Sequence, residues 1–143
     1  MAITQTMCTS FKKALLDGEM DFSANTNQSY KIALYTNSAS LDATTETYTT
    51  SNEASGTGYT PGGVALTIST APTTSGTTAY LSFRNATWAN STITARGALI
   101  YQTGGTTPAV AVLDFGSDKS TSGTTFQVTF PTANATTAIV RVA

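Results

Sequence analysis

Residues 96–115, RGALIYQTGGTTPAVAVLDF, decide the fold class. The runs 97–101 and 110–115 are apolar at nearly every position, so both of their faces are apolar. This pattern is typical of central strands that are covered on two sides. Gly104 and Gly105 between the runs indicate a turn. The stretch therefore predicts two buried strands that are joined as a hairpin.

Shorter runs on either side of this stretch alternate apolar and polar residues. Such alternation places one face of a strand on a core and the other toward solvent. Polar turns separate the runs at the spacing expected of a sandwich, so we expect one antiparallel β-sandwich of about eight strands, jelly-roll-like or immunoglobulin-like. The alternating runs are 30–35, 64–69, 79–84 and 125–130, and the run 138–142 closes the chain.

The first residues predict one amphipathic helix over 1–18, followed by the β-sandwich domain over 19–143. Ile3, Met7, Phe11 and Leu15 recur every four residues and form one apolar stripe. Gly18 follows as a natural stop. We expect the helix to cap an open end of the sandwich or to contact a partner subunit. The predicted core of the whole domain consists of Phe11, Leu15, Ile32, Leu34, Leu66, Ile68, Leu81, Phe83, Leu99, Ile100, Val110, Val112, Leu113, Phe126, Val128, Phe130 and Val140.

The length and charge of the chain restrict its partners. Its 143 residues fit a single domain. Charged residues make up only 10% and the net charge is −1, so the scattered basic residues do not form the footprint that nucleic acid requires. No apolar run approaches the roughly 18–20 residues of a spanning helix, and the first residues do not resemble a secretory signal. We therefore expect neither a nucleic acid nor a membrane as a partner.

Threonine is abundant in this chain, whereas charged residues are few. About a fifth of the residues are threonine, whose β-branched side chain suits a pleated, half-exposed surface. The single cysteine, Cys8, cannot form an internal disulfide, which indicates synthesis in a reducing cytosol. We interpret Cys8 as a small apolar residue at the edge of the core.

A long polar stretch with few apolar residues covers positions 36–63. A compact domain rarely keeps such a loop without a use for it, so the stretch is a candidate for binding a neighbouring subunit. A pair of very polar strands with a connector is an equally good interpretation. Residues 56–63, GTGYTPGG, predict an exposed feature rich in turns, without the lysine and flanking elements of a phosphate-binding loop.

The search for metal sites finds no convincing pattern. The chain contains no histidine, which removes imidazole-based nucleophile systems and the common histidine metal sites. Asp17, Glu19 and Asp21 superficially resemble the start of a calcium loop. Phe22 and Gln28, however, occupy the places where that loop needs glycine and glutamate. We interpret the three carboxylates as an acidic, solvated turn.

Two other groups were candidates for chemistry. Two carboxylates suffice for glycoside hydrolysis, but we interpret Asp114 as a strand-end residue that binds local backbone amides and Asp118 as part of a solvated turn. Aromatic residues can form a sugar-stacking platform, although a core tryptophan with tyrosines at strand edges is the preferred interpretation. The sequence therefore predicts no enzyme, no catalytic residue, no metal and no cofactor. The platform residues would be Trp88, Tyr48, Tyr59, Tyr80 and Tyr101.

Four stretches carry a family resemblance: KIALYT (31–36), NEASGTGY (52–59), TITARGALIY (92–101) and AVLDFGSDK (111–119). With them the chain resembles small virion structural proteins of tailed bacteriophages, cyanophages among them. The resemblance extends from the N-terminal helix to Arg141 and Val142. It implies a component of the mature particle that is present in many copies, and it carries over no catalytic or binding residues.

We expect a capsid decoration, or cement, protein that is made in the host cytoplasm and located in the virion. It would bind the outside of the head between major capsid proteins, as a homotrimer whose many contacts reinforce one another. The first alternative is an adaptor, knob or fibre-associated module of the tail, with residues 36–63 docked on a neighbour. The second is a carbohydrate-binding module that uses exposed aromatic residues.

Overall fold

The computed structural model describes residues 2–143 and confirms a mainly β chain with one short helix. Every ladder between strands is antiparallel, as the sequence predicts for a sandwich. In chain order the elements are β1 (Thr6–Met7), α1 (Thr9–Asp17), β2 (Tyr30–Tyr35), β3 (Val64–Leu66), β4 (Ile68–Ser75), β5 (Thr78–Phe83), β6 (Ala86–Ser91), β7 (Thr94–Gln102), β8 (Ala109–Ser120), β9 (Thr124–Val128) and β10 (Val140–Val142).

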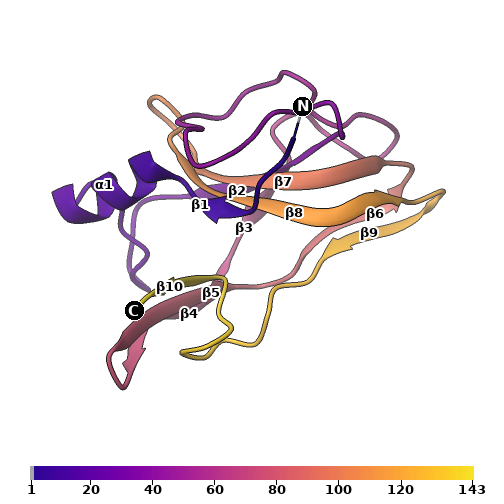
Figure 1. Ribbon diagram of the computed structural model, residues 1–143. Coiled ribbons are helices and arrows are strands. Elements are labelled where there is room, and N and C mark those ends of the chain that lie inside the picture. Colours follow the sequence, from indigo (N-terminus) through magenta and orange to yellow (C-terminus); the bar gives the residue numbers. More distant parts are fainter. Residues whose placement is uncertain (1) are drawn as a thin grey trace.

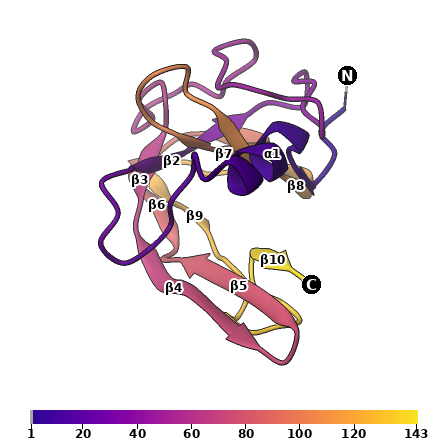
Figure 2. The ribbon, with the colours of Figure 1, turned by 90° about the vertical axis from the view of Figure 1, so that its left-hand side faces the viewer.

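The strands form three sheets. The largest has the order β1-β8-β7-β2-β3, and it occupies the upper half of Figure 1. The smaller sheets have the orders β10-β5-β4 and β6-β9. The hairpin of β4 and β5 extends away from the largest sheet, as both views show (Figures 1 and 2).

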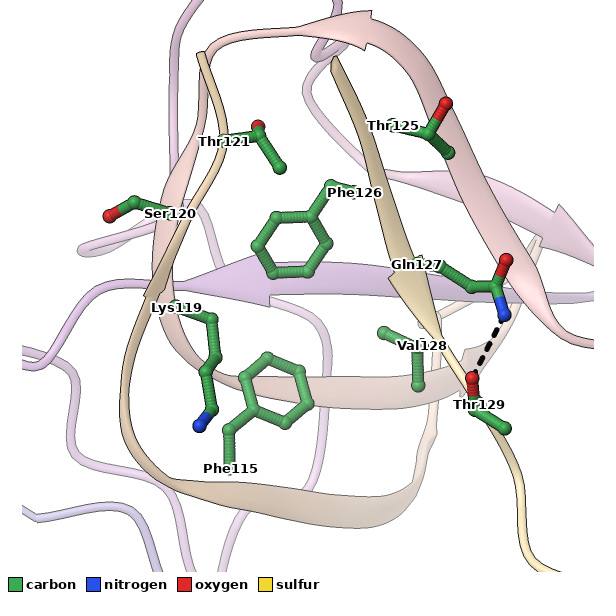
Figure 3. Close-up of a pocket in the computed structure, with 9 residues that line it drawn as sticks. All are labelled: Phe115, Lys119, Ser120, Thr121, Thr125, Phe126, Gln127, Val128 and Thr129. Carbon is green, nitrogen blue, oxygen red and sulfur yellow. Dashed lines mark hydrogen bonds between the residues drawn. The ribbon is translucent and has the colours of Figure 1, made fainter.

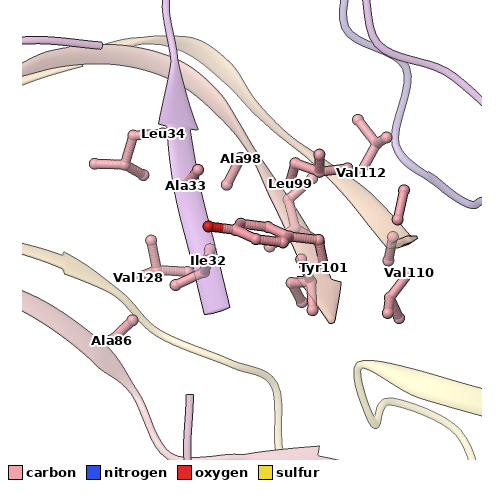
Figure 4. Close-up of a cluster of buried hydrophobic side chains, with 14 of the residues drawn as sticks. Ile32, Ala33, Leu34, Ala86, Ala98, Leu99, Tyr101, Val110, Val112 and Val128 are labelled. Carbon is pink, nitrogen blue, oxygen red and sulfur yellow. The ribbon is translucent and has the colours of Figure 1, made fainter. Parts of the chain in front are cut away.

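The hairpin of β7 and β8 forms the centre of the largest sheet and confirms the first prediction. Leu99 pairs with Val112 and Ala98 with Leu113. These side chains are buried on both faces of the sheet. Figure 4 shows Val128 of β9 on the same side as Ile32 of β2, so the two-stranded sheet covers one face of the largest sheet.

The helix prediction is wrong for the residues before Thr9. Thr6 and Met7 are strand residues that pair with Val112 and Ala111 at the outer edge of β8. The backbone N–H groups in the first turn of a helix have no partner within the helix, whereas the open edge of a strand offers partners for the backbone. These residues therefore pair with β8, although their apolar side chains recur every four residues. The predicted stop is correct, because Gly18 ends α1 in the left-handed region at φ 71°.

The alternating run 64–69 is divided between two sheets. Val64–Leu66 pairs with β2, whereas Ile68 begins β4 in the three-stranded sheet. The strand change leaves Leu66 and Ile68 half-buried, and Leu15 of α1 is half-buried as well. These three predicted core residues lie at the margin of the core. The other predicted members are buried, and several aromatic side chains that were not predicted join them, among them Phe22, Tyr30, Tyr35 and Tyr101.

A substitution at Gly63 tests how tightly the chain is held against β2. A Cβ at Gly63 would lie 1.8 Å from the backbone oxygen of Ile32, and φ is +80°. Gly76 is the matched control, with φ +62° and no atom within 4 Å of its Cβ position. We expect Gly76→Ala to lower the free energy of unfolding by about 1 kcal/mol. Gly63→Ala should lower it by more than about 4 kcal/mol or prevent folding. Urea titration measures both, and equal losses would contradict the close approach.

Candidate functional site

The long polar stretch 36–63 is folded onto the molecule. Ala54 donates its backbone N–H to the oxygen of Leu34 at 2.8 Å, and Thr36 donates to the oxygen of Asn52 at 2.9 Å. Residues 52–54 thus continue the pairing of β2 beyond the end of β3. The interpretation as a pair of polar strands is not confirmed, because residues 36–63 contain no strand and pair only through isolated bridges such as Tyr35 with Glu53 and Thr47 with Pro108. Whether it also binds a neighbouring subunit stays a prediction.

The carboxylate of Glu53 is the centre of this stretch. Tyr48 donates its hydroxyl to Oε1 at 2.6 Å, and Tyr59 donates to Oε2 at 2.5 Å. The backbone N–H of Gly62 donates to Oε2 at 2.7 Å. Tyr101 of β7 in turn donates to the backbone oxygen of Gly62 at 2.7 Å. A negatively charged acceptor with three donors makes strong, charge-assisted hydrogen bonds, so this group fixes the loop to the sheet.

Residues 56–63 are rich in turns and five of the eight are exposed, as predicted, yet the segment also lies close to neighbouring backbone. A Cβ at Gly56 would lie 2.1 Å from the backbone oxygen of Thr92, and one at Gly58 would lie 2.9 Å from the Cα of Ser91. Tyr59 is buried and accepts a hydrogen bond from the backbone N–H of Leu34 at 3.0 Å. The glycines of this segment are therefore needed for close approach, and only some of its residues face solvent.

The acidic turn after α1 makes local contacts. Asp17 forms an exposed ion pair with Lys13. Asp21 accepts a hydrogen bond from the backbone N–H of Ser23 at 2.8 Å, which lowers the pKa of its carboxyl group. Within residues 2–143, no three His, Cys, Asp or Glu side chains are grouped as a metal ion would require. The interpretation as a solvated turn matches these contacts.

The two carboxylates of the conceivable glycosidase pair bind different partners. Asp114 accepts from the backbone N–H of Gly116 at 2.9 Å and from Nε of Arg96 at 3.0 Å, and these bonds lower the pKa of its carboxyl group. A general acid needs the opposite shift. Asp118 accepts from the side-chain amide of Asn37 at 3.1 Å. The predicted local role of Asp114 is confirmed, and residues 115–118 bulge out opposite Arg96.

The alternative interpretation, an aromatic platform for sugars, does not exist as a surface. Trp88 is buried, lying near Tyr59 and edge-on to Phe126. Tyr48 stacks on Tyr101 at a ring distance of 4.7 Å, and Tyr101 is also buried. Tyr80 lies apart from them on β5. The preferred interpretation of Trp88 as a core residue is confirmed, whereas the tyrosines contribute more to the interior than the sequence predicts.

Sequence reasoning missed a shallow pocket beside the bulge of β8. Its volume is about 400 Å³. Figure 3 shows the rings of Phe115 and Phe126 on one side of Lys119, with threonine and serine hydroxyls around them. Lys119 is the only titratable side chain among the nine lining residues. The pocket therefore offers contact surface and hydrogen bonds, without an acid–base pair.

Cys8 is a fully buried residue next to α1. Desolvation, with a smaller contribution from Asp42, raises the pKa of its thiol to about 11. A thiol in this state is a poor nucleophile at neutral pH. The interpretation of Cys8 as a small apolar packing residue is confirmed.

Comparisons with protein-family models, curated proteins and solved structures gave no match to this chain. Among the described residues, no helix has the length and apolar character to cross a membrane.

Replacing Glu53 tests whether its carboxylate holds the loop. Glu53→Gln places an amide where three donors now converge, so at least one donor loses its partner. We expect the free energy of unfolding to fall by about 2 kcal/mol. Glu46→Gln is the control, because Glu46 is an exposed carboxylate in the same stretch, and it should stay within about 0.5 kcal/mol. Equal effects of the two variants in a denaturant titration would contradict the role of Glu53.

The buried tyrosines predict a loss of stability at alkaline pH. Burial raises the pKa values of Tyr30, Tyr35 and Tyr59 above the ordinary value of about 10, so the unfolded chain releases these protons first. Their contribution is fully present below about pH 10 and decreases as the pH rises toward the folded-state pKa values. We expect Tyr35→Phe to reduce the slope of stability against pH by up to about 1.4 kcal/mol per unit above pH 10.

Urea midpoints between pH 8 and pH 11.5 measure this slope. Ile32→Val is the control, because it weakens the same strand without removing an ionisable group. This variant should lower the free energy of unfolding at every pH and leave the slope of that free energy against pH unchanged. A slope for Tyr35→Phe equal to that of the unmodified chain would contradict the prediction.

Proposed function

We propose that this chain is a phage virion structural protein that binds the outside of the capsid as a decoration protein. It acts by adhering to other proteins, and its strength comes from many equivalent contacts on one particle. Each added contact is intramolecular once the first has formed, so the combined affinity can exceed a single contact by roughly 10²–10⁴. A protein that binds only the assembled shell also stabilises that shell by linkage.

The observation that carries the proposal is the projecting half of the hairpin of β4 and β5. Every residue from 72 to 77 is exposed, and Thr74 pairs with Ala79, which is exposed as well. An isolated hairpin with both faces in water is only marginally stable. Residues 72–77, called the arm below, add little to the core of their own domain. In the proposed complex, a surface of another protein covers the arm.

The chemistry of the arm suits a contact surface. It presents Thr73, Thr74, Ser75 and Thr77, whose short hydroxyl side chains lose less entropy on being fixed than lysine or glutamate would. The carboxylates that might have served catalysis are engaged elsewhere, Glu53 by tyrosines and Asp114 by Arg96. These observations favour adhesion over turnover, and the buried Trp88 removes the basis for a sugar-binding platform.

The proposal is tested on purified virions of a phage whose genome encodes this chain. We expect quantitative mass spectrometry to find the chain in hundreds of copies per particle and cryo-electron microscopy to place it on the outer capsid surface. Tens of copies or fewer, with density on the tail, would favour the tail-adaptor alternative. Absence of the chain from the particle would overturn both.

The role of the arm has its own test in a binding assay with capsids that lack this chain. Thr74→Arg combined with Thr77→Arg should weaken capsid binding at least about tenfold, because bulky charges replace hydroxyls in the contact. Thr87→Arg is the matched control on the exposed face of β6. Circular dichroism confirms that all variants fold. Equal binding by the arm variant and the control would show that the arm is not the contact.

A further inference from the structure

Two strands that follow one another in the chain do not pair. Only residues 121–123 connect β8 to β9, and a connection of this length commonly joins two strands of a hairpin. In the described part of the chain, however, β8 pairs with β1 and β7, and β9 pairs with β6 alone. The two strands belong to different sheets, and the pocket of about 400 Å³ is lined by both of them.

This pocket follows the free edge of β9. Five consecutive residues, 125–129, line it, although successive side chains of a strand point to opposite faces. A continuous lining of this kind means that the backbone of β9 borders the pocket. None of the nine lining residues belongs to β6, so the pocket lies at the edge of β9 that β6 leaves open.

The backbone groups on this edge suit an extended chain. Apart from the ladder with β6, residues 125–129 make no backbone hydrogen bond within the described part of the chain. An open strand edge carries unpaired N–H and C=O groups at a regular spacing, which the backbone of another strand matches. When a peptide adds to a sheet edge, these hydrogen bonds give affinity, and contacts to alternate side chains give specificity.

The charge of the pocket favours an acidic side chain. Lys119 is the only charged residue that lines it, and among residues 2–143 it forms no ion pair. The two neighbouring carboxylates are engaged by other partners, because Asp118 binds Asn37 and Asp114 binds Arg96. The ammonium group of Lys119 is therefore available to a carboxylate from another molecule.

An apolar surface lies beside this charge. The ring centroids of Phe115 and Phe126 are 6.2 Å apart, and Figure 3 shows both rings near Lys119 in the space between the two strands. Phe126 is buried, whereas Phe115 is half-buried, so an apolar side chain that covers Phe115 removes its remaining surface from water. Residues two positions apart in a strand point to the same face. One acidic and one apolar side chain at that spacing can therefore contact Lys119 and the rings together.

We propose that the pocket between β8 and β9 binds an extended segment of another protein, which adds as a strand to the free edge of β9. The segment carries a carboxylate that faces Lys119 and, two positions away, an apolar side chain that covers Phe115 and Phe126. The volume of about 400 Å³ lies within the range of roughly 300–1,000 Å³ that is typical of ligand sites. This binding does not involve the arm and does not depend on a role in a virion.

Titration with short peptides, followed by nuclear magnetic resonance, tests the proposal. The probe is the capped peptide acetyl-Thr-Asp-Thr-Val-Thr-amide, and a second peptide, with Asp and Val exchanged, covers the other direction of strand addition. We expect one of the two to shift the backbone amide signals of residues 119–129 with a Kd on the order of 1 mM. Asn in place of Asp should weaken binding at least about threefold. If neither peptide shifts these signals, the proposal is overturned.

Substitution of Lys119 tests the charge contact. Lys119→Glu should weaken binding of the Asp peptide at least about tenfold, and this variant should prefer a peptide with Lys in place of Asp. Lys12→Glu is the matched control, because it reverses the charge of another exposed lysine, on α1, and it should leave the affinity unchanged. Circular dichroism checks that both variants fold. Equal affinities of the two variants for the Asp peptide would exclude the carboxylate contact.

Backbone methylation separates strand addition from a contact of side chains alone. One form of the peptide carries N-methyl groups on Asp and Val, and the other carries them on the three threonines. Successive residues of an added strand direct their N–H groups alternately toward the neighbouring strand and away from it. One methylated form should therefore lose binding while the other retains it. Equal affinities of the two forms would rule out addition to β9.

Discussion

The carboxylate of Glu53 determines how the polar stretch 36–63 is arranged. It accepts hydrogen bonds from two tyrosine hydroxyls and one backbone N–H, and through Gly62 it is linked to Tyr101 in the central sheet. A stretch with few apolar residues cannot fold onto a sheet by hydrophobic burial alone. A charged acceptor surrounded by donors supplies the missing specificity, because each donor would be left unsatisfied in another arrangement.

This arrangement also explains how the molecule protects one of its sheet edges. β3 covers only the first half of β2, and the segment around Glu53 pairs with the rest. The short β1 covers part of the edge of β8 in the same way. Uncovered strand edges invite pairing with other chains. The parts of the molecule that project outside the largest sheet are the hairpin of β4 and β5 and the helix α1.

The sequence predicted the parts of the fold that follow from local pattern. The apolar runs of β7 and β8 and the stop at Gly18 were correct because periodicity and glycine chemistry act over a few residues. Met7 was wrongly placed in a helix because its partner, Ala111, is distant in the chain. The role of Glu53 was missed for a different reason: its partners Tyr48, Tyr59 and Gly62 lie within nine residues of it, but periodicity does not show how an irregular loop orients a side chain. Two tyrosines that flank a carboxylate in a charge-poor chain were a usable signal.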